Sequence, residues 1–128
     1  MAHYEEWIKR AKSSLELAQA KKTQLIFYED LCFQSQQAAE KALKGLLIFF
    51  GIEPEFTHNI GLLLNELAKI IVIPKNVENA INVTKYAIQT RYPGQYDEIT
   101  KDEYEKSVET AKDCLDWVEK TIKDKIVP

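Results

Sequence analysis

The feature that most constrains the fold is an unbroken apolar stripe between residues 28 and 50. Apolar and small side chains recur there at intervals of three and four residues, which is the spacing of one face of an α-helix. The members of the stripe are Tyr28, Leu31, Cys32, Ser35, Ala38, Ala39, Ala42, Leu43, Leu46, Leu47 and Phe50. Gly51 follows directly, and glycine often ends helices because it adopts the left-handed conformation without strain. The pattern predicts one long central helix that other helices must cover.

Two further segments have strong helical patterns at the ends of the chain. A stripe beginning at Tyr4 predicts a first helix that ends near the Lys21–Lys22 pair. Near the other end, Thr100-Lys101-Asp102-Glu103 matches a capping box, the sequence signature of a helix start. The apolar residues after it alternate in steps of four and three, the spacing of a heptad seam: Tyr104, Val108, Ala111, Leu115, Val118 and Ile122.

The middle of the chain predicts two more helices, separated by turn residues. Thr57 is expected to cap a third helix that carries Ile60, Leu63, Leu64, Leu67 and Ala68. Pro74 is expected to open a fourth, whose inward-facing residues are Val77, Ala80, Ile81, Thr84, Ala87 and Ile88. The predicted fold of residues 1–128 is a single all-α domain, an up-and-down bundle of four long helices plus one shorter helix.

Charge and cysteine content exclude several classes of protein. The net charge is −3 with both signs interspersed, so the chain lacks the overall basic character of many nucleic-acid binders, and any such binding must be local. Cys32 and Cys114 lie within apolar stripes and lack the spacing of a metal or redox pair, which predicts buried free thiols. No apolar run approaches the roughly 18 residues that span a bilayer, and no secretion signal is seen, so we expect a cytoplasmic protein without a membrane segment.

Apolar residues outside these stripes suggest self-association. Trp117 and Cys114 lie beside the heptad seam, and residues 70–73 form an apolar run. Large exposed apolar patches usually mark interfaces, which predicts a homodimer. The alternative is that all of these side chains lie in the core of one monomer.

Three sequence blocks carry a family resemblance. Residues 35–47 read SQQAAEKALKGLL, Thr57-His58 follows the next turn, and Arg91-Tyr92-Pro93-Gly94 precedes the last helix. Together they resemble the HEPN domain family, in family order and over nearly the whole chain. The resemblance implies a helical bundle, a homodimer and a partner, namely a minimal nucleotidyltransferase encoded beside it in a toxin–antitoxin-like pair of a bacterium or archaeon.

The resemblance also bears on catalysis. HEPN ribonucleases carry an arginine followed, after four to six residues, by a histidine that moves protons during attack by the RNA 2′-hydroxyl. After Arg91 the matching positions hold Tyr96, Asp97 and Glu98. A tyrosine with a pKa near 10 is a poor proton shuttle at neutral pH compared with a histidine near 6.5. We therefore expect no catalytic residue of this kind, and the motifs of other enzyme classes, including those for cofactors, are missing as well.

Six residues are the candidates for binding a nucleotide or RNA: Arg91, Tyr92, Tyr96, His58, Gln36 and Lys41. Arg91 precedes a Pro-Gly turn and has a guanidinium suited to phosphate. His58 lies at a predicted helix start, near backbone N–H groups able to hold an anion, although a structural histidine that bonds across the bundle is the alternative. Lys41 and Lys44 have the spacing of a solvated face, where Glu40 and Lys44 would form a surface pair.

Three functions therefore remain open from the sequence. The first is a HEPN-type binding module that docks its partner and holds a nucleotide or RNA near Arg91. The second is a divergent metal-independent ribonuclease that uses Arg91, Tyr96 and His58. The third is a purely structural dimerisation scaffold. No metal site is expected in any of them.

Overall fold

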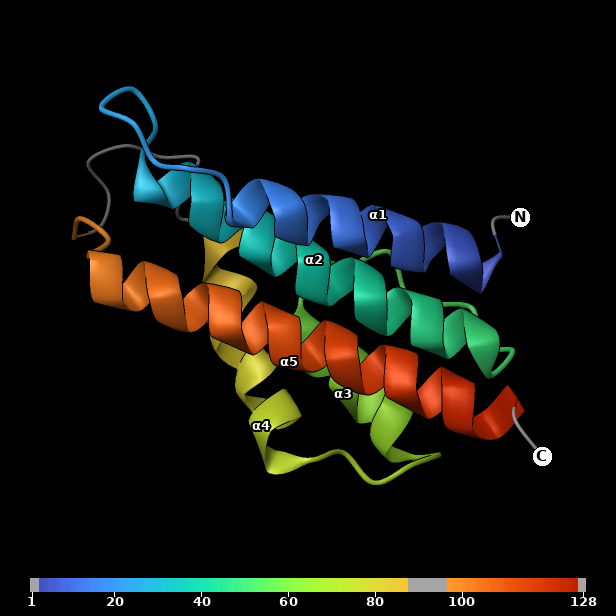
Figure 1. Cartoon of the computed structure of the whole chain (residues 1–128). Helices are drawn as coiled ribbons and strands as arrows, with labels where there is room; N and C mark the ends of the chain where they lie inside the picture. The colour runs from blue at the N-terminus through green and yellow to red at the C-terminus, as the bar shows by residue number, and fades with distance from the viewer. Residues whose placement is uncertain (1–2, 88–96, 127–128) are drawn as a thin grey trace.

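The protein is an all-α bundle in a computed structural model that describes residues 3–87 and 97–126 (Figure 1). The elements are α1 (Tyr4–Ala18), α2 (Tyr28–Phe49), α3 (Ile60–Ala68), α4 (Lys75–Glu78), the 3₁₀-helix η1 (Asn79–Ala87) and α5 (Lys101–Ile126). The predicted all-α class is confirmed. None of the helices in the described part is long and apolar enough to cross a membrane.

Helix α2 lies at the centre of the bundle, as its stripe predicts. It contacts α1, α3, η1 and α5. Figure 1 shows α1, α2 and α5 as three long helices side by side, with α1 antiparallel to the other two, while α3, α4 and η1 cover a further side of the bundle. The beginning of α1 and the ends of α2 and α5 therefore lie at the same end of the molecule (Figure 1).

Gly51 ends α2 in the conformation that its sequence position predicts. Its φ is 79°, in the left-handed region, and among the glycines that the structure describes it is the one with a positive φ. The Ile52 N–H donates to the Leu47 carbonyl and the Gly51 N–H to the Ile48 carbonyl, each at 2.9 Å. This pair of bonds is the Schellman motif, which satisfies carbonyls that the helix end would otherwise leave open.

A second glycine sets the distance between α1 and α2. A Cβ atom at Gly45 would lie 2.9 Å from Ile8 Cδ1, 3.1 Å from Trp7 Cβ and 3.4 Å from the Tyr4 carbonyl oxygen. Distances this short mean that only a residue without a side chain lets the two backbones approach so closely. Gly45 thereby fixes the first turns of α1 against α2.

Two details of the middle segment differ from the sequence predictions. Asn59, not Thr57, caps α3: the Asn59 side chain accepts from the Gly61 N–H at 2.9 Å, and Thr57 Oγ1 instead accepts from the Asn59 N–H at 3.0 Å. The fourth helical segment is α-helical only over Lys75–Glu78 and continues as the 3₁₀-helix η1.

The change of helix type alters which residues of η1 face inward. A 3₁₀-helix repeats every three residues, so Ala80, Val83 and Tyr86 share one face and are buried. Ile81, expected inside on an α-helical pattern, is 51% exposed. Ile88, also expected inside, lies outside the described residues.

Helix α5 confirms the helix start predicted at Thr100 and most of the seam, although the Glu103 carboxylate contacts Tyr86 and Lys85 instead of completing a capping box. The Glu103 N–H donates to Thr100 Oγ1 at 3.1 Å. Ala111, Leu115, Val118 and Ile122 are buried, whereas Tyr104 and Val108 are half-buried.

The apolar residues that suggested a dimer divide between core and surface. Cys114 is fully buried within the monomer and Trp117 is half-buried against the core, so these two need no partner chain to cover them. Within the apolar run, Ile71 and Ile73 pack against the core, but Ile70 is 41% and Val72 91% exposed. The run therefore supplies a smaller exposed surface than its sequence suggests.

Both cysteines are buried and free, as predicted. Burial raises the pKa of the Cys32 thiol to about 11 and that of the Cys114 thiol to about 12. Thiols with such pKa values stay protonated and unreactive at neutral pH, because the thiolate is the nucleophile. They serve as small core residues.

Candidate functional site

A polar cluster crosses the interior of the bundle from α2 to the segment before α3. Gln36, Glu40 and Lys44 follow one another at four-residue intervals on α2, and all three are buried. Glu40 Oε2 lies 2.9 Å from Lys44 Nζ, and Glu40 Oε1 lies 2.8 Å from His58 Nδ1. Glu40 is therefore the hub of the cluster.

Gln36 ties the cluster to the backbone of the histidine. Its Nε2 donates to Glu40 Oε1 at 2.9 Å and to the His58 carbonyl at 3.0 Å, while its Oε1 accepts from Gln37 Nε2 at 2.7 Å. The position of His58 is thus fixed through both its ring and its backbone. A network with every buried member bonded is rigid as well as stable.

The hydrogen bonds determine the charge of Glu40. Burial alone raises the pKa of this carboxyl, but hydrogen bonds from Gln36, His58 and Lys44, together with the Lys44 charge, outweigh burial and hold the pKa of Glu40 below its ordinary value. The carboxyl is therefore ionised at neutral pH and can only accept. His58 Nδ1 must carry the proton of the bond to Glu40, which leaves Nε2 as the atom that can serve a ligand.

A surface hollow of about 430 Å³ opens over this cluster. It is lined by Lys44, Phe56, Thr57, His58, Asn59, Thr84 and Ala87. The His58 side chain is 53% exposed, whereas its partner Glu40 is only 5% exposed. The arrangement presents one imidazole to solvent while a buried carboxylate holds it in place.

The N-terminus of α3 does not supply the anion-binding N–H groups that the sequence suggested. The Ile60 N–H donates to Thr84 Oγ1 at 3.1 Å, the Gly61 N–H to Asn59 Oδ1, and the Leu62 N–H to the Asn59 carbonyl at 3.2 Å. These N–H groups already have partners. An anion at this end of the hollow would therefore meet the imidazole of His58 instead of free backbone N–H groups.

The structure brings together some of the residues singled out from the sequence. Gln36 and His58 belong to one cluster, but Gln36 is fully buried and supports His58 instead of facing solvent. Lys41 points elsewhere: its Nζ lies 2.9 Å from Ser14 Oγ on α1, and its burial between the helices lowers its pKa. Arg91, Tyr92 and Tyr96 lie outside the described residues.

Sequence reasoning missed the role of Glu40 and Lys44. The pair was expected on a solvated face, but their side chains are only 5% and 9% exposed. A four-residue Glu–Lys spacing is typical of exposed helix surfaces, so the pattern was misleading here. The signal that would have corrected it is Gln36, which extends the same line of polar residues along a helix predicted to be central.

The comparisons with known proteins agree on one family. The HEPN domain matches residues 4–121. A relative from Methanocaldococcus jannaschii, named Putative toxin MJ1304, is 28% identical over 137 aligned positions that cover 93% of this chain and 88% of the relative.

Solved structures give the same result at the level of the fold. ST0689, described as an archaeal HEPN homologue, is 36% identical with a TM-score of 0.76, over 95% of this chain and 99% of that one. TT1696 from Thermus thermophilus is 33% identical with a TM-score of 0.81, over 94% of this chain and 98% of that one. The resemblance read from residues 35–47, Thr57-His58 and residues 91–94 is confirmed, and the chain belongs to the HEPN domain family.

Proposed function

We propose that this chain is the HEPN member of a toxin–antitoxin-type pair and that it binds the phosphate of a nucleotide or RNA beside His58. The observation that carries the proposal is the Glu40–His58 pair, in which a buried carboxylate orients a half-exposed imidazole over a hollow. The relative from Methanocaldococcus jannaschii bears the name Putative toxin MJ1304, which supports the biological setting. The partner implied by the family resemblance is a minimal nucleotidyltransferase.

The chemistry of the hollow suits a phosphate ester. The Glu40 carboxylate holds the imidazole at Nδ1 and leaves Nε2 free to meet a ligand, and an Nε2–H group donates to an oxyanion. Thr57 and Asn59 add polar side chains at the same rim. Arg91 follows Ala87, another lining residue, by four positions in the sequence, and we propose it as the second phosphate ligand, with Tyr92 and Tyr96 in the same stretch.

Calorimetric titration with AMP, ATP and a short single-stranded RNA tests the binding proposal. We expect wild-type protein to bind at least one of these probes. His58→Ala and Arg91→Ala should each weaken that binding about tenfold or more, because a hydrogen bond to a charged group contributes about 1.5–3 kcal/mol. His3→Ala is the matched control, since His3 lies at the start of the chain and outside the hollow. Wild-type affinity in both variants, or no binding of any probe, would contradict the proposal.

The same geometry favours ribonuclease activity as a second candidate. In acid–base catalysis a carboxylate fixes the tautomer and orientation of an imidazole that moves a proton, and the 2.8 Å Glu40–His58 contact has this form. The RNA samples of the titration should therefore also be examined for 2′,3′-cyclic phosphate ends. Cyclic phosphate ends that are formed by wild type and lost in His58→Ala would show that the protein cleaves RNA with His58. Intact RNA would restrict the proposed function to binding.

The partner is tested by native mass spectrometry of this chain co-expressed with the genes that neighbour its own. We expect a complex of this chain with a nucleotidyltransferase, recorded together with any bound nucleotide or covalent adduct. The absence of any complex with a nucleotidyltransferase at micromolar concentration would refute the pairing, and the scaffold function would remain only if RNA binding and cleavage were absent as well. A co-expressed nucleotidyltransferase from an unrelated locus controls for non-specific association.

A further inference from the structure

The hollow over His58 also contains an exposed aromatic side chain. Phe56 lines the same hollow, two residues before the histidine, and has a relative exposure of 104%. The Thr57 N–H donates to the Glu55 carbonyl at 2.9 Å, across a tight turn centred on Phe56. Within the described part of the chain, the Phe56 ring packs against no other ring. An aromatic face is therefore open to a ligand in the same hollow as the imidazole.

The polar side chains of this hollow have donors left to offer a ligand. Asn59 Oδ1 accepts from the Gly61 N–H at 2.9 Å, and Thr57 Oγ1 accepts from the Asn59 N–H at 3.0 Å. The bond to Gly61 also fixes the orientation of the Asn59 amide, since its oxygen must face that N–H. The Asn59 Nδ2 group has no partner among the residues that the structure describes. It is therefore free to donate to an acceptor on the ligand.

An aromatic face beside a free donor suits a nucleobase. Bases of single strands stack on exposed aromatic side chains, whereas the faces of a base inside a duplex are already covered. Uracil and guanine carry carbonyl oxygens, O4 and O6, at the edge where cytosine and adenine carry amino groups that donate. The Asn59 donor matches the carbonyl bases and not the amino bases. The volume of the hollow, about 430 Å³, is in the range of small-ligand pockets.

We propose that this hollow holds an unpaired uracil or guanine of a single-stranded RNA, stacked on Phe56 and bonded through its carbonyl oxygen to Asn59 Nδ2. The base subsite rests on the phosphate site proposed at His58 and adds the class of base that the site selects. Phe56 covers one face of the base. This one-sided arrangement suits a strand, because the next base of the strand can cover the other face.

NMR titration with ribose 5-phosphate, uridine 5′-monophosphate (UMP) and cytidine 5′-monophosphate (CMP) separates the base from the phosphate. The three probes share one phosphate group, so the ratios of their affinities report the base. We expect wild type to bind UMP about fivefold or more tightly than ribose 5-phosphate, through stacking. It should bind UMP about threefold or more tightly than CMP, through one hydrogen bond. A uridylate hexamer should bind more tightly than UMP, and equal affinities would overturn the assignment to RNA.

Phe56→Leu keeps an apolar side chain but removes the ring. The ratio of UMP affinity to ribose 5-phosphate affinity should fall about fivefold or more, because leucine cannot stack. Phe27→Leu is the matched control, since Phe27 is a 64% exposed aromatic residue outside the hollow. His58→Ala should weaken both probes by the same factor, because they share the phosphate, and should leave their ratio unchanged.

Asn59→Asp tests the direction of the proposed hydrogen bond. Aspartate is as good an N-cap as asparagine, so the Gly61 N–H keeps its acceptor. The Nδ2 donor, however, is replaced by an acceptor oxygen. The preference should therefore invert toward CMP, whose amino group donates. The added negative charge repels the phosphate of both nucleotides alike, so the ratio of their affinities still reports the base. Circular dichroism of each variant confirms that the bundle is intact.

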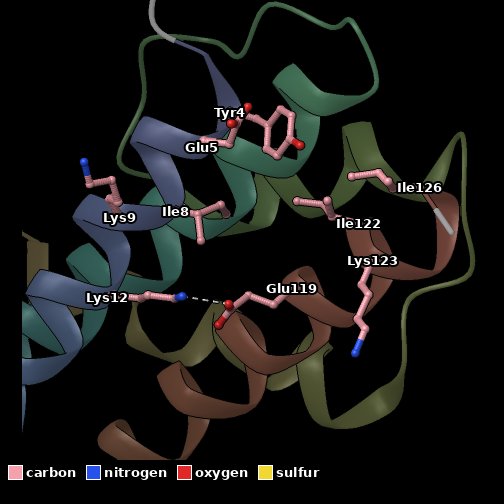
Figure 2. A pocket seen from close by; sticks show the side chains of 9 residues that line it. All are labelled: Tyr4, Glu5, Ile8, Lys9, Lys12, Glu119, Ile122, Lys123 and Ile126. Atoms are coloured by element: carbon pink, nitrogen blue, oxygen red, sulfur yellow. Dashed lines mark ion pairs between the residues drawn. The ribbon is translucent and has the colours of Figure 1, made fainter.

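A second hollow of the molecule is the competing place for an aromatic base. It has a volume of about 420 Å³ and lies between the first half of α1 and the last turns of α5. Figure 2 shows Ile8 and Ile122 pointing toward one another across it, while Lys12 and Glu119 form an ion pair at 2.9 Å. Methyl signals distinguish the two places. UMP should shift the signal of Ala87, which lines the hollow over His58, and not those of the two isoleucines.

Several outcomes would overturn the base subsite. They are UMP that shifts the isoleucine signals instead, UMP that binds no better than ribose 5-phosphate or than CMP, and affinity ratios that Phe56→Leu or Asn59→Asp leaves unchanged. In each of these cases, ribose 5-phosphate binding that is lost in His58→Ala would still uphold the phosphate site, so the two proposals fail separately. No binding of any probe would overturn both.

Discussion

Glu40→Ala is expected to destabilise the protein by about 3–5 kcal/mol, because it leaves a buried lysine without its counter-ion. Lys44 is 9% exposed, and its Nζ bonds to Glu40 Oε2 at 2.9 Å. The substitution also removes an acceptor from Gln36 Nε2 and from His58 Nδ1. Urea denaturation at a fixed protein concentration, followed by circular dichroism, measures the loss of unfolding free energy.

Glu66→Ala is the matched control for this substitution. Glu66 and Lys69 also form an ion pair, at 3.2 Å, but their side chains are 36% and 71% exposed. Pairs of this kind contribute about 0–1 kcal/mol, so the control should unfold almost like wild type. Equal effects of Glu40→Ala and Glu66→Ala would show that the buried cluster does not stabilise the bundle.

The same carboxylate makes stability depend on pH in a defined direction. The cluster holds the pKa of Glu40 below its ordinary value of 4.5, so its stabilising contribution is complete above the pKa of the unfolded state. That contribution is lost as pH falls through the lower pKa of the folded state. The difference in unfolding free energy between wild type and Glu40→Ala should therefore narrow below about pH 4, near the ordinary glutamate pKa. A difference that widens on acidification would contradict the assigned charge.

Leu46→Ala is expected to cost about 2–5 kcal/mol, through the apolar contacts it removes and the cavity it leaves. Leu46 lies on the central helix with 0% exposure and belongs to the main core. Helices α1, α3, η1 and α5 surround α2, which limits how far the core can collapse onto the missing side chain. Thermal and urea unfolding of the variant give the loss directly.

Leu25→Ala is the control with the same change of side chain. Leu25 lies between α1 and α2 with 90% exposure. Surface substitutions of this type usually stay within about 0.5 kcal/mol of wild type. If the two leucine variants unfolded alike, the assignment of α2 as the centre of the core would be wrong.

Local signals in the sequence were enough for the three long helices α1, α2 and α5, but not for the 3₁₀ conformation of η1. The stripe from Tyr28 to Phe50, the glycine at position 51 and the Thr100 cap each depend on residues within a few positions of one another. Where two local solutions compete, the sequence predicted less well. Thr57 and Asn59 both suit an N-cap, and only the hydrogen bond to the Gly61 N–H distinguishes them.

The candidate site was predicted only in part. His58 was singled out because it lies at a predicted helix start, and Gln36 because it belongs to the block that resembles the HEPN family. Glu40 was expected to be a surface residue. Its contact with His58 joins residues 18 positions apart in the sequence, and no local pattern indicates which carboxylate a histidine will meet.

The sequence by itself determined the all-α class, the central helix and the membership in the HEPN family. Helix periodicity, capping residues and family motifs each depend on residues that lie close together in the sequence. The tertiary structure alone decided which polar residues are buried. Helix α2 is enclosed by α1, α3, η1 and α5, so the line of Gln36, Glu40 and Lys44 faces protein where an isolated helix would face water. Burial of a charge depends on what packs against it, and that is a property of the assembled bundle.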